Sequence, residues 1–151
     1  MKMIRSFAVL ALFLSGVVNS GCTTAGTEVI ENQDRSLAEL QALVVAALPA
    51  GKHSVSQNGR TYTSNYFVAE KGEFVEALDT PTRNKAVIVI LGDRRPYNLE
   101  VNVVHEKKNS SSEYVSTGND EGLARVVIRR IQKALHERRD NRNIIDDFRI
   151  F

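Results

Sequence analysis

Apolar residues recur at helical spacing shortly after Ser36. They follow one another at intervals of three or four, at Leu37, Leu40, Val44, Ala47 and Leu48. Ser36 and Glu39 stand three apart, the spacing of a capping box in which each side chain bonds the other residue's backbone amide. Pro49 follows directly and cannot continue a helix. The pattern predicts a helix over residues 36–48.

A second helical pattern lies near the carboxy terminus. Its apolar positions have the i, i+3, i+4, i+7 spacing of one buried face, at Ala124, Val127, Ile128, Ile131, Ala134 and Leu135. Thr117 precedes this pattern as a candidate N-cap, and Glu121 suits the positive end of the helix. We predict a helix over residues 119–139.

The residues between these helices favour hairpins of β-strands. Asn58-Gly59 is a strong hairpin signal because both residue types tolerate the positive φ of a type I′ turn, and it predicts pairing of 52–57 with 60–69. The apolar run 86–91 predicts a central strand, and the alternation over 97–106 predicts a strand with one solvated face. Residues 113–116 form a candidate edge strand, whereas 73–83 fit either a strand or a helical turn.

The order of helix, hairpin, hairpin and helix predicts an α+β fold. We expect a two-layer sandwich, with an antiparallel sheet of about four or five strands and both helices on one face. Residues 35–151 would form a single globular domain. The segment 143–151 is apolar for a free end, so we expect it to dock on the domain or pair along a sheet edge.

The amino terminus has the layout of a secretory signal peptide. Lys2 and Arg5 are basic, residues 7–18 are apolar apart from Ser15 and Gly16, and small residues follow. The apolar run is shorter than the ~20 residues that a membrane-spanning helix needs. Residues 1–21 are therefore interpreted as a cleaved signal peptide.

The next residue, Cys22, is the only cysteine of the chain. The sequence Asn19-Ser20-Gly21-Cys22 resembles the lipobox of bacterial lipoproteins, with Asn19 standing where that family usually has an aliphatic residue. The resemblance implies a diacylglycerol on the Cys22 sulfur, cleavage before Cys22 and a fatty acid on the new amino terminus. Residues 22–34 would be the lipidated terminus and a polar tether, and no other cofactor is expected.

Two further features bear on this interpretation. An unpaired thiol in an exported protein is exposed to oxidation, and acylation consumes it. Thr23 stands where an Asp commonly retains such lipoproteins at the inner membrane, so the resemblance implies the outer membrane, facing the periplasm. The alternative is ordinary cleavage before Gly21, which would leave a soluble periplasmic domain.

Charge gives no reason to expect a nucleic-acid partner. Lys2 and Arg5 precede Cys22, so 18 of the 20 basic residues remain in the mature chain against 18 acidic residues. A near-neutral domain in an exported location does not fit nucleic-acid binding.

No catalytic or metal motif stands out along the chain. His53, His105 and His136 lie on different expected elements without ligand spacing, and there is no Gly-x-Ser-x-Gly or Ser-x-x-Lys sequence. The pair at 146–147 (Asp-Asp) is interpreted as solvated carboxylates of the tail. We expect a protein that is not an enzyme and binds no metal.

The carboxy-terminal helix carries a candidate face for an anionic partner. The face comprises Arg125, Arg129, Arg130 and Lys133, of which the first, second and fourth are spaced by four. This row could meet an envelope protein or an anionic glycolipid, or it could be an ordinary solvated face. The aromatic strand with Tyr62, Tyr66 and Phe67 fits the core better than a ligand platform.

The leading hypothesis is a lipid-anchored cell-envelope protein with a non-catalytic binding or assembly role. One alternative is a soluble periplasmic domain or a carrier of a lipid or small molecule in a cavity between sheet and helices. Another is a hydrolase with a dispersed site, because catalytic triads are defined by geometry rather than by sequence order.

Overall fold

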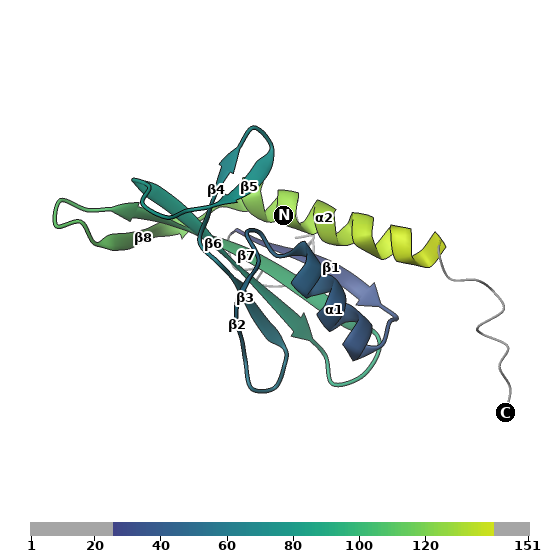
Figure 1. The fold of residues 1–151 in the computed structure, drawn as a ribbon. Coiled ribbons are helices and arrows are strands. Elements are labelled where there is room, and N and C mark those ends of the chain that lie inside the picture. Colours follow the sequence, from purple (N-terminus) through teal and green to yellow (C-terminus); the bar gives the residue numbers. More distant parts are fainter. Residues whose placement is uncertain (1–25, 141–151) are drawn as a thin grey trace, which may run out of the picture.

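The structure is a computed structural model that describes residues 26–140, and the side chains of residues 26–137. Its elements are β1 (Thr27–Gln33), α1 (Leu37–Ala47), β2 (Lys52–Val55), β3 (Thr61–Ser64), β4 (Phe67–Glu70), β5 (Glu73–Glu76), β6 (Thr82–Leu91), β7 (Tyr97–Lys108), β8 (Tyr114–Asn119) and α2 (Glu121–Asp140). The eight strands form one open antiparallel sheet with two helices (Figure 1). The α+β class is therefore confirmed.

The β6–β7 hairpin is the centre of the sheet. It is paired without interruption from Thr82 opposite Lys107 to Leu91 opposite Asn98. Alternate residues of both strands are buried on one face, namely Ala86, Ile88 and Ile90 opposite Val103, Val101 and Leu99. The period of two seen in the sequence thus selects the face that meets the helices.

Both helices pack on this buried face. One hydrophobic cluster joins it to Leu40, Leu43 and Val44 of α1 and to Ala124, Val127 and Ile131 of α2. Each fully buried Leu or Ile side chain contributes about 1.5–3 kcal/mol through the hydrophobic effect. The predicted capping box is confirmed: the Ser36 amide donates to Glu39 Oε2 at 3.0 Å, and the Glu39 amide donates to Ser36 Oγ at 3.3 Å.

The sheet is larger than the predicted four or five strands. Residues 27–33, which the sequence led us to interpret as part of a tether, form β1 and pair with β7. The register places Thr27 opposite Asn102 and buries Ile30 opposite Leu99. The tether interpretation is wrong for this segment because a partner strand about 70 residues away satisfies its backbone.

The first hairpin also differs in detail. β2 pairs with β3 as predicted, but Gly59 has φ +64° whereas Asn58 keeps a negative φ, so the turn is not type I′. The predicted strand 60–69 is interrupted at Asn65, whose backbone amide and side-chain amide donate to the carbonyls of Gly51 and Ala50. The residues after this break form β4, which pairs with β5.

The carboxy-terminal elements are shifted from their expected ends. β8 is longer than the expected 113–116, and α2 begins after Asp120, whose carboxylate accepts from the Leu123 amide at 2.9 Å. The predicted cap, Thr117, instead donates to the His105 carbonyl within the sheet. Cys22, the predicted signal peptide and the tail 143–151 lie outside the described residues.

Candidate functional site

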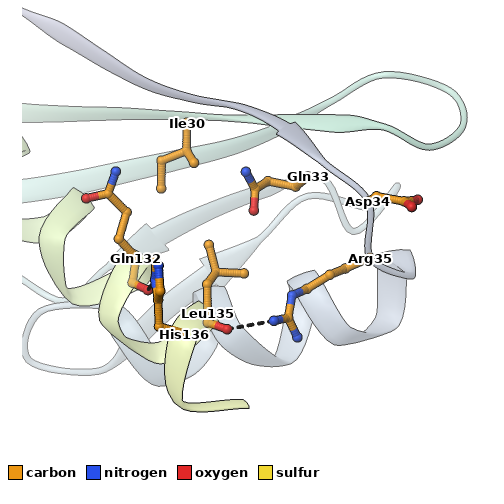
Figure 2. Close-up of a pocket in the computed structure, with 7 residues that line it drawn as sticks. All are labelled: Ile30, Gln33, Asp34, Arg35, Gln132, Leu135 and His136. Atoms are coloured by element: carbon orange, nitrogen blue, oxygen red, sulfur yellow. Dashed lines mark hydrogen bonds between the residues drawn. The ribbon is translucent and has the colours of Figure 1, made fainter. Parts of the chain in front are cut away.

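A pocket of about 570 Å³ opens where the end of β1, the turn before α1 and the carboxy-terminal half of α2 meet. It is lined by Ile30, Gln33, Asp34, Arg35, Gln132, Leu135 and His136 (Figure 2). The α2 residues fall at i, i+3 and i+4, which places them on one side of the helix. β1 and α2 therefore form two walls of the pocket, and the turn closes its end.

Arg35 is the residue that distinguishes this pocket. Its Nη2 donates to the Leu135 carbonyl at 2.6 Å, in the carboxy-terminal half of α2, where a cation complements the helix dipole (Figure 2). Within the described residues, its Nη1 is buried and has no hydrogen-bond partner; Asn102 Oδ1 on the sheet is the other such atom. A buried guanidinium N–H without an acceptor is costly and calls for a further partner.

The remaining polar groups of the pocket are arranged around the buried side chains of Ile30 and Leu135. His136 Nδ1 lies 2.8 Å from the Gln132 carbonyl, which can only accept, so this nitrogen carries a proton. Gln33 Nε2 donates to a backbone carbonyl at 2.6 Å and leaves its own amide oxygen available as an acceptor.

The pocket lining combines groups that can bind a ligand with two acid–base residue types, Asp34 and His136. No Ser, Thr, Cys or Lys is among the seven residues that line the pocket. In a catalytic triad, a carboxylate orients the histidine that acts as the base. His136 Nδ1 instead bonds a backbone carbonyl, so this pair is not formed at His136. The pocket offers donors, acceptors and a small apolar patch, and its volume lies within the usual range for ligand sites.

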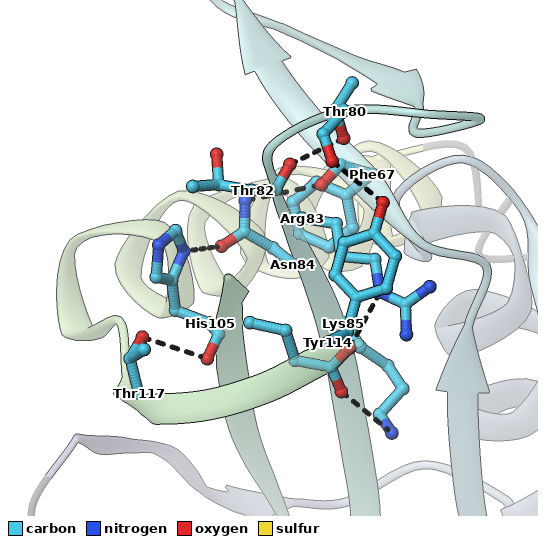
Figure 3. A network of polar contacts seen from close by, with 10 residues as sticks. Phe67, Thr80, Thr82, Arg83, Asn84, Lys85, His105, Tyr114 and Thr117 are labelled. Carbon is cyan, nitrogen blue, oxygen red and sulfur yellow. Dashed lines mark hydrogen bonds and ion pairs between the residues drawn. The ribbon is translucent and has the colours of Figure 1, made fainter. Parts of the chain in front are cut away.

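A second polar region, which we name the β6 network, lies at the start of β6 (Figure 3). The Arg83 guanidinium carbon lies 3.5 Å from the ring centroids of both Tyr66 and Tyr114. Arg83 Nε donates to Glu106 Oε2 at 2.7 Å, and the Glu106 carboxylate is largely buried. The cation is therefore held by two aromatic faces and one carboxylate.

Asn84 and His105 complete the β6 network. Asn84 is buried; its Nδ2 donates to the Phe67 carbonyl at 3.3 Å, and its Oδ1 accepts from His105 Nδ1 at 2.7 Å (Figure 3). Tyr114 donates to the Thr80 carbonyl at 2.8 Å. These bonds join β4, β6, β7 and β8, so the β6 network acts as a structural connection within the sheet.

Three of the four basic residues of the candidate anionic-partner face on α2 already have partners within the domain. Arg125 bonds Glu28 and Glu121, and Lys133 Nζ lies 3.7 Å from the carboxylate of Glu137. The Arg130 guanidinium lies 4.1 Å from the ring centroid of a phenylalanine, Phe74. Arg129 alone among the four is exposed with no described ionic or aromatic contact. An anionic partner on this face stays a prediction. The internal contacts leave less positive charge free to bind such a partner.

The three histidines do not converge. His53 is exposed on β2, His105 belongs to the β6 network and His136 lines the pocket. Over residues 26–140, no group of three or more His, Cys, Asp and Glu is placed to hold a metal ion. Of the three aromatic residues expected in the core, Tyr62 and Phe67 lie there, whereas Tyr66 is half-buried and stacks on Arg83.

The resolved pKa shifts arise from surface ion pairs and from the core. A hydrogen bond from Lys108 lowers the pKa of Asp79, and the same bond raises the pKa of Lys108. The hydrogen bond to Glu28 raises the pKa of Arg125, and burial raises the pKa of Tyr62. These four groups lie outside the pocket.

Sequence reasoning missed the pocket and Arg35. The β-branched residues Thr27, Val29 and Ile30 were the available signal for a strand there, but the surrounding polar residues resembled a tether. In the part of the chain that the structure describes, neither helix is apolar enough over a sufficient length to cross a bilayer.

Comparison with known proteins identifies no family for this chain. No protein-family model, no curated protein and no solved structure matches the chain.

Proposed function

We propose that this chain is a lipid-anchored protein of the bacterial cell envelope, held through Cys22 at the outer membrane and facing the periplasm. The observation that carries the proposal is the position of the only cysteine, directly after a signal-peptide pattern and the small pair Ser20-Gly21. Several acyl chains on one residue anchor a protein stably, whereas a single chain binds only marginally.

We propose further that the domain has a non-catalytic binding or assembly role and that the pocket is its binding site. Support comes from the contrast within the pocket: Arg35 is half-buried and oriented by its bond to Leu135, yet its Nη1 lacks an acceptor. A ligand oxygen that reached this nitrogen, which is buried from solvent in the structure, would satisfy it. Ile30 and Leu135 would supply apolar contact beside it.

Metabolic labelling with an alkyne fatty acid tests the anchor. The wild-type protein is expected to take up the label and to fractionate with the outer membrane, whereas Cys22→Ser should lose both properties. Asn19→Leu is the matched control, because it restores the family's usual aliphatic residue and should process at least as completely. Equal labelling of the wild-type and Cys22→Ser proteins would sink the lipoprotein assignment.

Site-specific photo-crosslinking in the native envelope tests the binding role. A photo-reactive residue at Gln132 lies in the pocket, and the same residue at Arg129 is exposed one turn earlier on α2. We expect a discrete adduct at Gln132 that is absent at Arg129. Identical adduct patterns at the two positions would remove the pocket from the proposal.

A further inference from the structure

The chain enters the domain at a fixed point beside α2. Gly26 has φ +87°, and a Cβ there would lie 2.6 Å from the Cβ of Asn119, the last residue of β8. A side chain at this position would be strained and would clash, so glycine is required. We name the surface around Gly26, Thr27 and the first turn of α2 the foot of the domain.

The foot is close to the proposed anchor. Because β1 begins at Thr27, only five Cα–Cα steps separate it from Cys22. A fully extended chain covers at most about 3.4 Å per residue, so the foot lies within about 17 Å of the lipidated residue. The polar tether expected from the sequence alone would have allowed more than twice this distance.

The pocket lies at the other end of the same two elements. α2 runs alongside β1 in the same direction, since Arg125 bonds Glu28 near the foot and Leu135 lines the pocket with Ile30 and Gln33 (Figure 1). Glu28 pairs with Val101 and Gln33 with Tyr97, so across its bulge β1 rises by only four residue steps of β7, about 13 Å. From Arg125 to Leu135, α2 rises about 15 Å. The two elements therefore give similar separations between the foot and the pocket.

We propose that the anchored domain stands with its foot at the bilayer and holds the pocket on its membrane-distal side. The pocket then receives a water-borne ligand that presents an oxygen acceptor to Arg35, rather than a lipid of the leaflet that holds the anchor. This inference rests on the proposed lipidation of Cys22. It adds the orientation of the domain relative to the membrane, and it states that the ligand comes from the water rather than from the bilayer.

Fluorescence quenching by lipids with a nitroxide headgroup tests the orientation. The chain contains no tryptophan, so a single introduced tryptophan is the only one that reports. Glu121→Trp and Glu137→Trp form a matched pair: both are on α2, and each removes one exposed ion pair with the residue four positions away. The two positions are about 24 Å apart along the helix.

In liposomes that hold the lipidated protein, we expect quenching several-fold stronger at position 121 than at position 137. A long flexible Gly/Ser spacer between Ala25 and Gly26 should weaken the quenching at 121 and reduce the difference. Equal quenching of the two unspaced proteins, or stronger quenching at 137, would overturn the orientation.

The mature protein coupled through the Cys22 thiol to a maleimide lipid separates the two proposals. If this conjugate shows the expected difference but the cellular protein carries no lipid, the anchor fails and the geometry holds. If both carry lipid and show equal quenching, the orientation alone fails. A photo-reactive residue at Gln132 in the same liposomes should give no lipid adduct, and a lipid adduct would contradict the water-borne ligand.

Discussion

The β6 network and the pocket each contain a partly buried arginine, and the two guanidinium groups differ in their partners. In the β6 network, Arg83 lies between two tyrosine rings and bonds a largely buried carboxylate. In the pocket, Arg35 makes one bond to a helix carbonyl, and its other terminal nitrogen is buried without a partner. Among the described residues, no buried side-chain polar atom of the first region lacks a hydrogen-bond partner, whereas the second region holds one that does.

This difference separates structural from functional polar groups. A satisfied buried network stabilises one arrangement of strands, and removing any member leaves its partners unpaired. An unsatisfied donor costs stability unless something else supplies an acceptor. A substitution in the β6 network should therefore affect mainly unfolding, and one at Arg35 should affect mainly binding.

The largest effect is expected from Asn84→Ala. It leaves the Phe67 carbonyl and His105 Nδ1 without their bonds in a buried site, which should lower the free energy of unfolding by about 2–3 kcal/mol. Urea unfolding followed by circular dichroism measures the change. Asn109→Ala is the control: in the exposed loop before β8 it removes bonds from the Ser111 and Glu113 amides that water can replace, so it should cost clearly less. An equal cost would contradict a structural role for Asn84.

The next effect is expected from Arg83→Leu, which removes the stacked cation and leaves Glu106 with only Lys85 at 4.0 Å. We expect a loss of about 1–2 kcal/mol in unfolding free energy. Arg83→Lys keeps the charge but lacks the planar group between the rings, so it should fall between the wild type and Arg83→Leu. If the lysine variant matched the wild type, the aromatic stacking would contribute nothing.

A smaller stability effect is expected from Arg35→Met. Loss of the bond to the Leu135 carbonyl is partly offset because the unpartnered Nη1 is removed as well, so unfolding free energy should change by about 1 kcal/mol or less. The crosslink expected from Gln132 should disappear. A variant that kept the crosslink, or that lost as much stability as Arg83→Leu, would remove the contrast between the two arginines.

The smallest effect is expected from Asp79→Asn, at the margin of the β6 network. Lys108 lowers the pKa of Asp79 in the folded protein, so this pair stabilises the fold above the carboxyl's unfolded pKa. The contribution is lost as the pH falls through the lower, folded pKa. Urea midpoints should therefore differ slightly between wild type and variant at pH 7 and coincide in strong acid, and a difference that grew in acid would reverse the sign.

Much of the secondary structure followed from local patterns. The capping box at Ser36, the buried stripe of α2 and the alternation along β7 each depend on residues within one or two turns or strand steps of one another. Such neighbours interact in any compact state of the chain. Their patterns therefore predict the elements without knowledge of their partners.

The pocket could not be predicted in the same way. It depends on a strand at 27–33 whose hydrogen-bond partner is β7 and on a turn that brings Arg35 to Leu135, a separation of 100 residues. The interruption at Asn65 likewise depends on carbonyls on the other side of a hairpin. No local pattern reports which distant backbone will satisfy these groups.

The sequence by itself determined an α+β domain with two amphipathic helices, a long central hairpin and a predicted lipid anchor before it. Only the tertiary structure decided that β1 belongs to the sheet, that the link to Cys22 is short and that Arg35 lines a pocket. The physical reason is that helix and strand periodicities are properties of neighbouring residues. Strand pairing and pocket formation depend on which remote groups meet when the apolar faces are buried together.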